Sequence, residues 1–139
     1  MAIRWDKDML VSYDGTKLDK VGFFVSDSGF SNLVLKIWTG DNASDLIYQD
    51  TIDQISINTW NEVSIDSLLI LDSSLEYWVG FRVLDQEAGK LPTGRDNGPA
   101  ISGYGDLVSV DEVNWESANK QNSGGNWNIS LWVDIVNFY

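Results

Sequence analysis

The sequence predicts an all-β fold, an antiparallel β-sandwich of jelly-roll type. Three observations predict it: apolar residues alternate with other residues at a period of two, no long stretch keeps the period of an amphipathic helix, and turn sequences separate the alternating segments. Successive residues of a strand point to opposite faces of a sheet, so each segment has one apolar face. Many short strands divided by turns are typical of sandwiches and barrels.

The expected elements follow one another along the chain without a break between domains. The alternation is most regular in residues 21–25, 33–38, 77–84 and 129–136, which we interpret as strands. Shorter strands are expected at residues 3–5, 46–51, 60–65 and 107–113, and a single helical turn within residues 6–12. Turn sequences occupy residues 13–15, 27–29, 39–42 and 122–125.

The least regular stretch is residues 85–106, which contains both prolines and five of the twelve glycines. A loop of this length inside a compact domain is often functional. The chain has no internal repeat, low-complexity tract or linker, so residues 1–139 are predicted to form a single domain.

Composition argues against several classes of function. The net charge is −12 and the nine Lys and Arg residues are scattered, which disfavours binding to nucleic acid or to anionic membranes. The chain has no His and no Cys, so a Ser–His–Asp triad and most zinc, copper or iron sites cannot be built. A glycosidase needs two carboxylates at a defined separation. With 21 acidic residues, some pair can always be chosen, so such a pair is no evidence of glycosidase activity. We therefore expect a protein that is not an enzyme and has no certain cofactor.

Seven tryptophans favour recognition instead. Three of them alternate with aliphatic residues of the expected strands and share their faces with polar or charged residues: Trp38, Trp78 and Trp132, beside Lys36, Arg82 and Asp134. The aliphatic face of a sandwich strand belongs inside, so these indoles are predicted on an outer face. If their strands share one sheet, they form an aromatic platform for sugar rings, with Gly80 leaving room for a ring. The alternative is that loops fold over this face and bury the indoles.

The remaining tryptophans are in other surroundings. Trp115, in an expected loop region, and Tyr104, between two glycines, form a second candidate binding set. Trp60 and Trp127 lie at strand starts and are predicted to be structural plugs at the ends of the sandwich, while Trp5 is undecided.

Acidic turns raise the question of calcium, which takes six to eight oxygen ligands. Three sets of side chains are candidates: Asp6, Asp8 and Asp14; Asp41, Asn42 and Asp45; Asp96, Asn97 and Asp106. Asp and Asn in turns usually bond to nearby backbone, which is the default interpretation. Structural calcium is the alternative.

A series of short phrases, read in order, carries a resemblance to known proteins. They lie at residues 13–15, 18–21, 35–40, 59–63, 76–81, 96–100 and 126–129. Together they resemble the β-sandwich accessory domains appended to secreted peptidases, adhesins and other surface proteins of Bacteroidetes-type bacteria, over about residues 2–136. The resemblance implies a jelly-roll-like, non-catalytic module that is secreted or held at the cell surface. It implies no ligand, and this chain departs from it by its acidity.

These observations lead to one expected function and one alternative. The first is a non-catalytic carbohydrate-binding module of a larger exported bacterial protein, with a polysaccharide or other glycan as its partner. The alternative is a structural, adhesin-like protein-interaction domain, attached to a secreted peptidase or surface protein and packed against its neighbouring domains.

Overall fold

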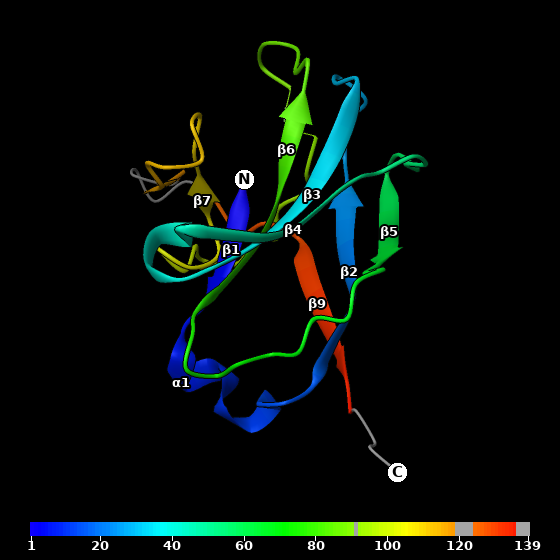
Figure 1. Cartoon of the computed structure of the whole chain (residues 1–139). Helices are drawn as coiled ribbons and strands as arrows, with labels where there is room; N and C mark the ends of the chain where they lie inside the picture. Colours follow the sequence, from blue (N-terminus) through cyan, green and yellow to red (C-terminus); the bar gives the residue numbers. More distant parts are fainter. Residues whose placement is uncertain (91, 119–123, 136–139) are drawn as a thin grey trace.

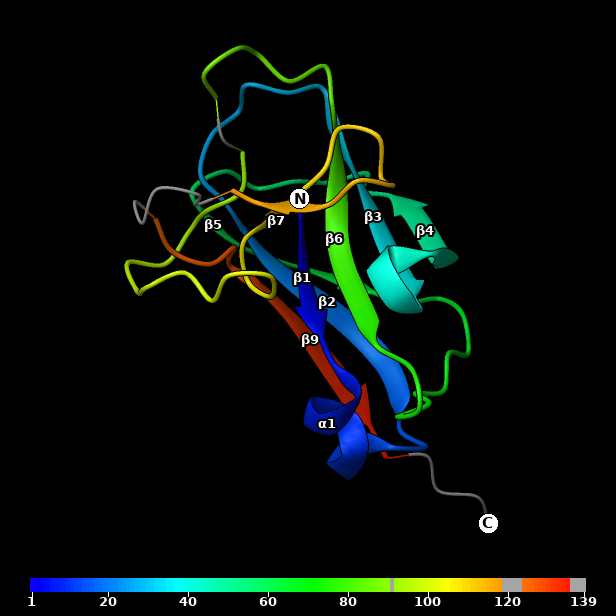
Figure 2. The same ribbon diagram turned by 90° about the vertical axis from the view of Figure 1, so that its left-hand side faces the viewer.

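Two antiparallel sheets face each other in the computed structural model, which describes residues 1–90, 92–118 and 124–135 (Figures 1 and 2). In spatial order, the larger sheet contains β4 (Asp45–Thr51), β3 (Asn32–Thr39), β6 (Tyr77–Leu84), β1 (Ala2–Trp5), β7 (Leu107–Val108) and β8 (Glu116–Ser117). The smaller sheet contains β5 (Thr59–Ser64), β2 (Lys17–Val25) and β9 (Ile129–Asp134). The short helices are α1 (Lys7–Leu10), η1 (Val11–Tyr13) and η2 (Asp41–Ala43). The predicted all-β sandwich is confirmed.

The regular alternating segments form the long strands β2, β3, β6 and β9. The prediction of a strand over residues 107–113 was wrong beyond Val108, because Asp111 draws the following backbone into a loop. The helical turn after β1 is confirmed, and Asp6 begins it by accepting a hydrogen bond from the backbone N–H of Met9 at 3.1 Å. Residue 136, the last of the predicted C-terminal strand, lies outside the described residues.

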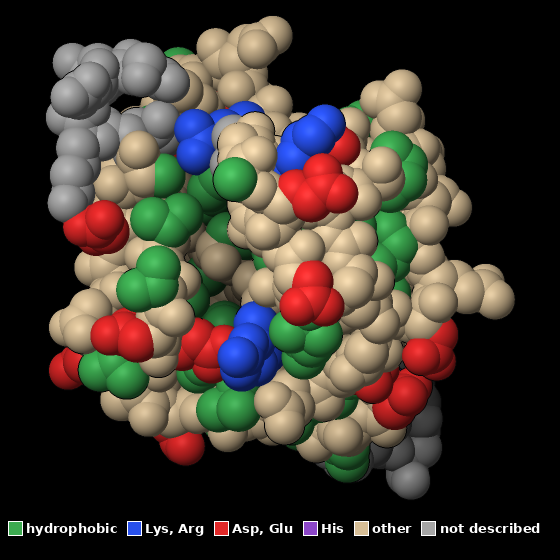
Figure 3. Space-filling model, turned by 90° about the horizontal axis from the view of Figure 1, so that it is seen from above, with side chains coloured by type: hydrophobic (Ala, Val, Ile, Leu, Met, Phe, Trp, Pro, Cys, Tyr) green, Lys and Arg blue, Asp and Glu red, His purple; other side chains and the backbone are tan. Residues whose placement is uncertain are grey.

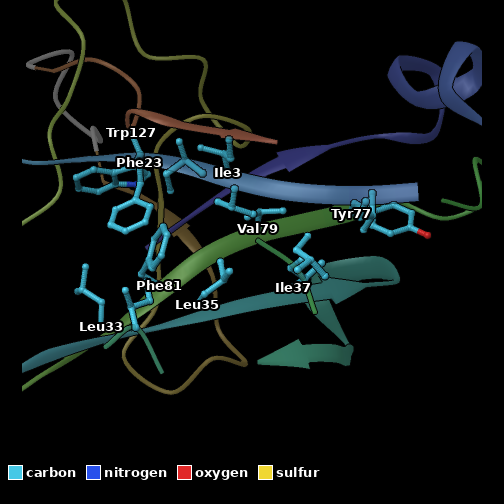
Figure 4. Close-up of a cluster of buried hydrophobic side chains, with 14 of the residues drawn as sticks. Ile3, Phe23, Leu33, Leu35, Ile37, Tyr77, Val79, Phe81 and Trp127 are labelled. Atoms are coloured by element: carbon cyan, nitrogen blue, oxygen red, sulfur yellow. The ribbon is translucent and has the colours of Figure 1, made fainter. Parts of the chain in front are cut away.

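The core lies between the sheets, where the aliphatic faces meet (Figure 4). Phe23 of β2 and Phe81 of β6 touch across the two layers, with ring centroids 4.5 Å apart. Around this pair pack the inward residues of the long strands, among them Val21, Val25, Leu33, Leu35, Ile37 and Val79, all fully buried. Trp127 is buried at one end of the core, and its indole N–H donates to the Leu107 carbonyl at 3.0 Å. The structural role predicted for Trp127 is confirmed.

The irregular stretch of residues 85–106 begins at the end of the sandwich where β6 finishes (Figure 1), and at Tyr104 it lies beside β1, where the Tyr104 carbonyl accepts the backbone N–H of Arg4 at 2.8 Å. It is tied to the smaller sheet by isolated bridges, Thr93 to Val25 and Arg95 to Trp127. The Asp96 carboxylate accepts hydrogen bonds from the backbone N–H of Asn126 and of Gly98, at 2.8 and 3.2 Å. Much of this loop is therefore fixed to the strands around it. Within the described part of the chain, no helix has the length and apolar character needed to cross a membrane.

Gly80 of β6 provides a test of this packing. Gly80→Ala is expected to lower the free energy of unfolding by about 1–3 kcal/mol, as for overpacking in a tight core. The added Cβ would overlap the Met1 carbonyl oxygen and lie 2.7 Å from the Cβ of Ala2, in the strand beside it. Urea unfolding measures the loss.

Gly98→Ala is the matched control for this variant. Its Cβ would meet its nearest neighbour, an Asp96 carboxylate oxygen, at 3.6 Å, an ordinary contact. The change in unfolding free energy should stay within about 0.5 kcal/mol. An equal loss of unfolding free energy in Gly80→Ala and Gly98→Ala would contradict the close packing of Gly80 against Met1 and Ala2.

Candidate functional site

The outer face of the larger sheet carries a buried tryptophan cluster. Trp38 of β3 and Trp78 of β6 are directly opposite each other in neighbouring strands. Trp115 covers both, with its ring centroid 5.4 Å from each of theirs. Trp38 is only 4% exposed and Trp78 only 2%. The alternative that loops bury these indoles is therefore the one found.

The predicted platform of Trp38, Trp78 and Trp132 was wrong for two physical reasons. The segment after β7 folds across the outer face and places Trp115 on the pair. In addition, Trp132 belongs to β9, in the other sheet, so the three indoles share no surface. Gly80 leaves no room for a sugar ring either, because the space beside it is filled by Met1 and Ala2.

Polar contacts hold this covering segment in place. The Asp111 carboxylate accepts hydrogen bonds from the backbone N–H groups of Asn114 and Val113, at 2.8 and 2.9 Å. These bonds, the one from Asn114 first, lower the pKa of Asp111 far below its ordinary value. The segment is also attached to β3, because Glu112 pairs with the buried Lys36 ammonium at 2.6 Å.

Tyr104 is half-buried, and it does not stand uncovered between its two glycines as predicted. The guanidinium of Arg4 lies 4.6 Å from the centroid of its ring, and its hydroxyl donates to the Asp6 carboxylate at 3.1 Å. Arg4 also lies 3.5 Å from Glu76, the residue that accepts the indole N–H of Trp78. Tyr104 is thus part of the packing around the buried cluster.

A hollow of about 920 Å³ opens beside this cluster, at the end of the molecule where β1 starts. Figure 3 shows it from above, lined by hydrophobic side chains with charged ones around it. Arg82 and Trp115, two of the predicted site residues, come together on its wall, and Trp127 and Phe81 also line it. Arg82 is exposed, and it also borders a shallower depression of about 520 Å³ over β3 and β4.

The outer face of the smaller sheet carries the exposed tryptophans. Trp132 of β9 is 39% exposed and Trp60 of β5 is 52% exposed. The prediction that Trp60 is an end plug was wrong, because it pairs with Phe24 in a register that turns both side chains outward. Phe24 and Trp60 touch edge to face, with ring centroids 6.1 Å apart.

Gly22 and a pair of charged residues lie between these aromatics. The benzene ring of Trp132 reaches across β2 and lies against Gly22, with one ring carbon 2.6 Å from where a Cβ would be. The Lys20 ammonium lies 4.9 Å from the centroid of the Trp132 ring and 3.0 Å from the Glu62 carboxylate. We call this set of residues the aromatic strip: Lys20, Gly22, Phe24, Trp60, Glu62 and Trp132.

The dimensions of the strip follow from sheet geometry. Trp60 and Trp132 lie on the two outer strands, opposite Phe24 and Lys20, so they are offset by four positions along β2. With strands about 4.8 Å apart and a rise of about 3.4 Å per residue, their Cα atoms are separated by roughly 16 Å. Asp134 is exposed on the same face, two residues beyond Trp132, as its alternation predicted. The strip is therefore long, open and edged by charge.

Two different signals in the sequence could have located the strip. Lys20, Gly22 and Phe24 alternate with the inward residues of β2, which predicts an outer face there. The turn directly before Trp60 favours a plug at the end of the sandwich, whereas the alternation of Trp60 with Val63 predicts an outward side chain.

Some of the acidic turn residues accept hydrogen bonds from backbone N–H groups, and several of these donors are distant in sequence. Asp14 accepts the N–H of Ser73 at 2.8 Å, and Asp96 accepts those of Asn126 and Gly98. Asp106 is buried and accepts from the Ser117 hydroxyl. No cluster of three or more acidic side chains that could hold a metal ion is found within residues 1–90, 92–118 and 124–135. Structural calcium stays the alternative to the default interpretation.

Comparisons of the chain with protein-family models, with curated proteins and with solved structures found no match. The candidate site therefore rests on its own residues and on their geometry.

Fluorescence quenching distinguishes the two sets of tryptophans. Acrylamide, a neutral quencher, is expected to reach mainly Trp60 and Trp132, because they are the most exposed of the described indoles. A double variant, Trp60→Phe with Trp132→Phe, should lose most of the quenchable emission. The matched double variant, Trp38→Phe with Trp78→Phe, should keep it. The opposite result would show that the faces are assigned the wrong way round.

Acid should release the segment that covers the buried cluster. The folded pKa of Asp111 lies below the ordinary 3.8, so its ionised carboxylate stabilises the segment above that pH. This contribution is lost as the pH falls through the lowered pKa. Near-ultraviolet circular dichroism should then report a change around Trp115 and Trp38.

The control for this acid transition is Asp111→Asn, which removes the titrating group. The variant should show a loosened cluster at neutral pH already and a weaker dependence on acid. Other carboxylates titrate in both proteins, so the difference between the two curves isolates Asp111. Superimposable acid profiles would exclude its proposed role.

Proposed function

We propose that this chain is a non-catalytic carbohydrate-binding module of an exported bacterial protein, and that it holds polysaccharide on the aromatic strip. The observation that carries the proposal is the pair of exposed tryptophans, Trp60 and Trp132, on an uncovered sheet face beside a Lys–Glu pair. The resemblance to accessory domains of bacterial surface proteins supports the setting. The function is recognition, which would keep a larger protein close to its polysaccharide.

Each part of the strip suits a sugar ring. One face of a pyranose presents C–H groups, which pack on an indole in the same way as other apolar groups. The ring hydroxyls need donors and acceptors nearby, and the Lys20 ammonium and Glu62 carboxylate supply both. Gly22 lets the Trp132 ring lie close to the sheet, so the ring is supported from below.

The rigidity of the strip favours binding. Its aromatic side chains stand on hydrogen-bonded strands, and Phe24 supports the edge of Trp60. Side chains that are already held in place lose little conformational entropy when a ligand arrives. A surface of this kind recognises a ligand without rearranging.

The shape and charge of the strip indicate the class of polysaccharide. A face roughly 16 Å long without walls fits several units of an extended chain. The net charge of −12 would repel a polyanionic glycan. We therefore infer a neutral, extended polysaccharide as the ligand.

Affinity electrophoresis through gels that contain neutral plant or microbial polysaccharides tests this proposal. At least one polysaccharide should retard the wild-type chain. Trp132→Ala and Trp60→Ala should each weaken binding by about tenfold or more, the order expected when a central aromatic contact is removed.

Tyr13→Ala is the matched control, because Tyr13 is an aromatic residue with 49% exposure that lies outside the strip. It should be retarded as strongly as the wild type. No retardation of the wild type across a broad panel would overturn the proposal, and so would equal retardation of all four proteins.

A further inference from the structure

An Asn–Gly step lies in the irregular stretch, within the exposed turn of residues 96–99. Asn97 is the only asparagine of the chain that a glycine follows, and both residues are exposed, so water reaches them. Asparagine is one of the thermolabile residue types. A following glycine hinders attack by its own backbone nitrogen least, because it has no Cβ. Sequence and exposure together therefore single out Asn97 as a reactive amide.

The surroundings leave the Asn97 side chain free to approach the Gly98 nitrogen. The side-chain amides of several other asparagines donate hydrogen bonds to neighbouring groups: Asn42, Asn61, Asn114 and Asn126. Within the described part of the chain, no such bond holds the Asn97 amide. A Cβ added at Gly98 would meet its nearest neighbour, an Asp96 carboxylate oxygen, at 3.6 Å. A ring that joins Asn97 to Gly98 therefore has room to form.

Asp96 binds the N–H group of the nitrogen that would react. Its carboxylate accepts the Gly98 N–H at 3.2 Å, and it also accepts the backbone and side-chain N–H groups of Asn126, at 2.8 and 3.1 Å. These bonds, the backbone bond from Asn126 first, lower the pKa of Asp96, so the group is ionised at neutral pH. A negative charge beside the nitrogen disfavours a second negative charge on it. Asp96 therefore opposes loss of the Gly98 amide proton.

We propose that Asn97 is a site of spontaneous deamidation, and that Asp96 restrains the rate of this reaction in the folded chain. The Gly98 nitrogen loses its proton to water or hydroxide and attacks the side-chain carbonyl carbon of Asn97. A C–N bond forms, and the bond from this carbon to the side-chain nitrogen breaks. That nitrogen takes up a proton from water and leaves as ammonia, and a succinimide ring remains. Water then opens the ring at either of its carbonyls, which gives aspartate or isoaspartate.

The two products change the charge of the turn and, for isoaspartate, the length of its backbone. Either product places a new negative charge next to the Asp96 carboxylate, which like-charge repulsion disfavours. Isoaspartate also adds a carbon atom to the backbone path, which moves the Gly98 N–H away from Asp96. The bonds between Asp96 and Asn126 hold this turn directly before Trp127, which is buried at the end of the core. Deamidation is therefore expected to loosen that end of the sandwich.

Peptide mapping by mass spectrometry tests the reaction on the whole chain. During incubation in mildly alkaline buffer, the peptide that contains Asn97 should convert to its aspartate and isoaspartate forms, because alkali removes the amide proton. Gly98→Ala should slow this conversion by about tenfold or more, because its Cβ hinders the attacking nitrogen. The same Cβ makes only an ordinary contact in the fold, so the variant stays folded. An unreacted Asn97 while other asparagines convert, or an unchanged rate in Gly98→Ala, would overturn the proposal.

Comparison of folded and unfolded chains tests the restraint by Asp96. The wild type should deamidate at least about threefold faster in urea than in its folded state, because unfolding breaks the bond from Gly98 to Asp96. Asp96→Ala should react faster than the wild type by a similar factor when both are folded, and at nearly the same rate in urea. Equal rates for the folded and unfolded wild type would contradict the restraint. An acceleration by Asp96→Ala that persists in urea would contradict it as well.

The effect of the modification on stability is measured on separated forms of the wild type. Ion exchange separates the deamidated chain from the unreacted one, because deamidation adds a negative charge. The deamidated form should unfold at a lower urea concentration than the unreacted form. Equal urea midpoints would contradict the loosening of the sandwich end that deamidation of Asn97 is expected to cause.

Discussion

The contact between Phe23 and Phe81 joins two sheets of unequal width, and each sheet carries strand tryptophans on its outer face. Both sheets turn their aliphatic faces to the same core, so each must leave its second face outside. The wider sheet has a long outer face, and the segment that follows β7 folds over it. The narrower sheet has an outer face on which Trp60 and Trp132 stay exposed. Indoles that alternate with aliphatic residues in the same way are therefore buried on the wider sheet and exposed on the narrower one.

Local alternation predicted much of this fold, because the side of a strand on which a residue lies depends only on its neighbours in sequence. The inward faces of β2, β3, β6 and β9 follow from it directly. Alternation holds no information about which strands are neighbours, so the sequence leaves open whether Trp38, Trp78 and Trp132 share one sheet. The pairing of Trp38 with Trp78 and the placement of Trp132 in the other sheet depend on contacts between distant parts of the chain.

The candidate site illustrates the same division. Trp132 and Asp134 were predicted outward and are outward. Burial of Trp38 and Trp78 under a loop was one of two alternatives that the sequence left open. Periodicity does not predict the path of a loop across a sheet, which here is held by polar groups such as Asp111 and Glu112. Trp60 shows that a turn before a strand is a poor guide to burial. Trp60 lies opposite Phe24 of the neighbouring strand β2, in a register that turns both side chains outward.

We propose that recognition takes place on the aromatic strip and not at the buried cluster. Titration of the isotope-labelled chain with neutral oligosaccharides, followed through the indole N–H signals of its seven tryptophans, tests it most directly. We expect the signals of Trp60 and Trp132 to shift with a common saturation curve, while those of Trp38, Trp78 and Trp127 stay unchanged. Shifts confined to Trp38, Trp78 or Trp115, or no shift of Trp60 and Trp132 with any oligosaccharide, would contradict it.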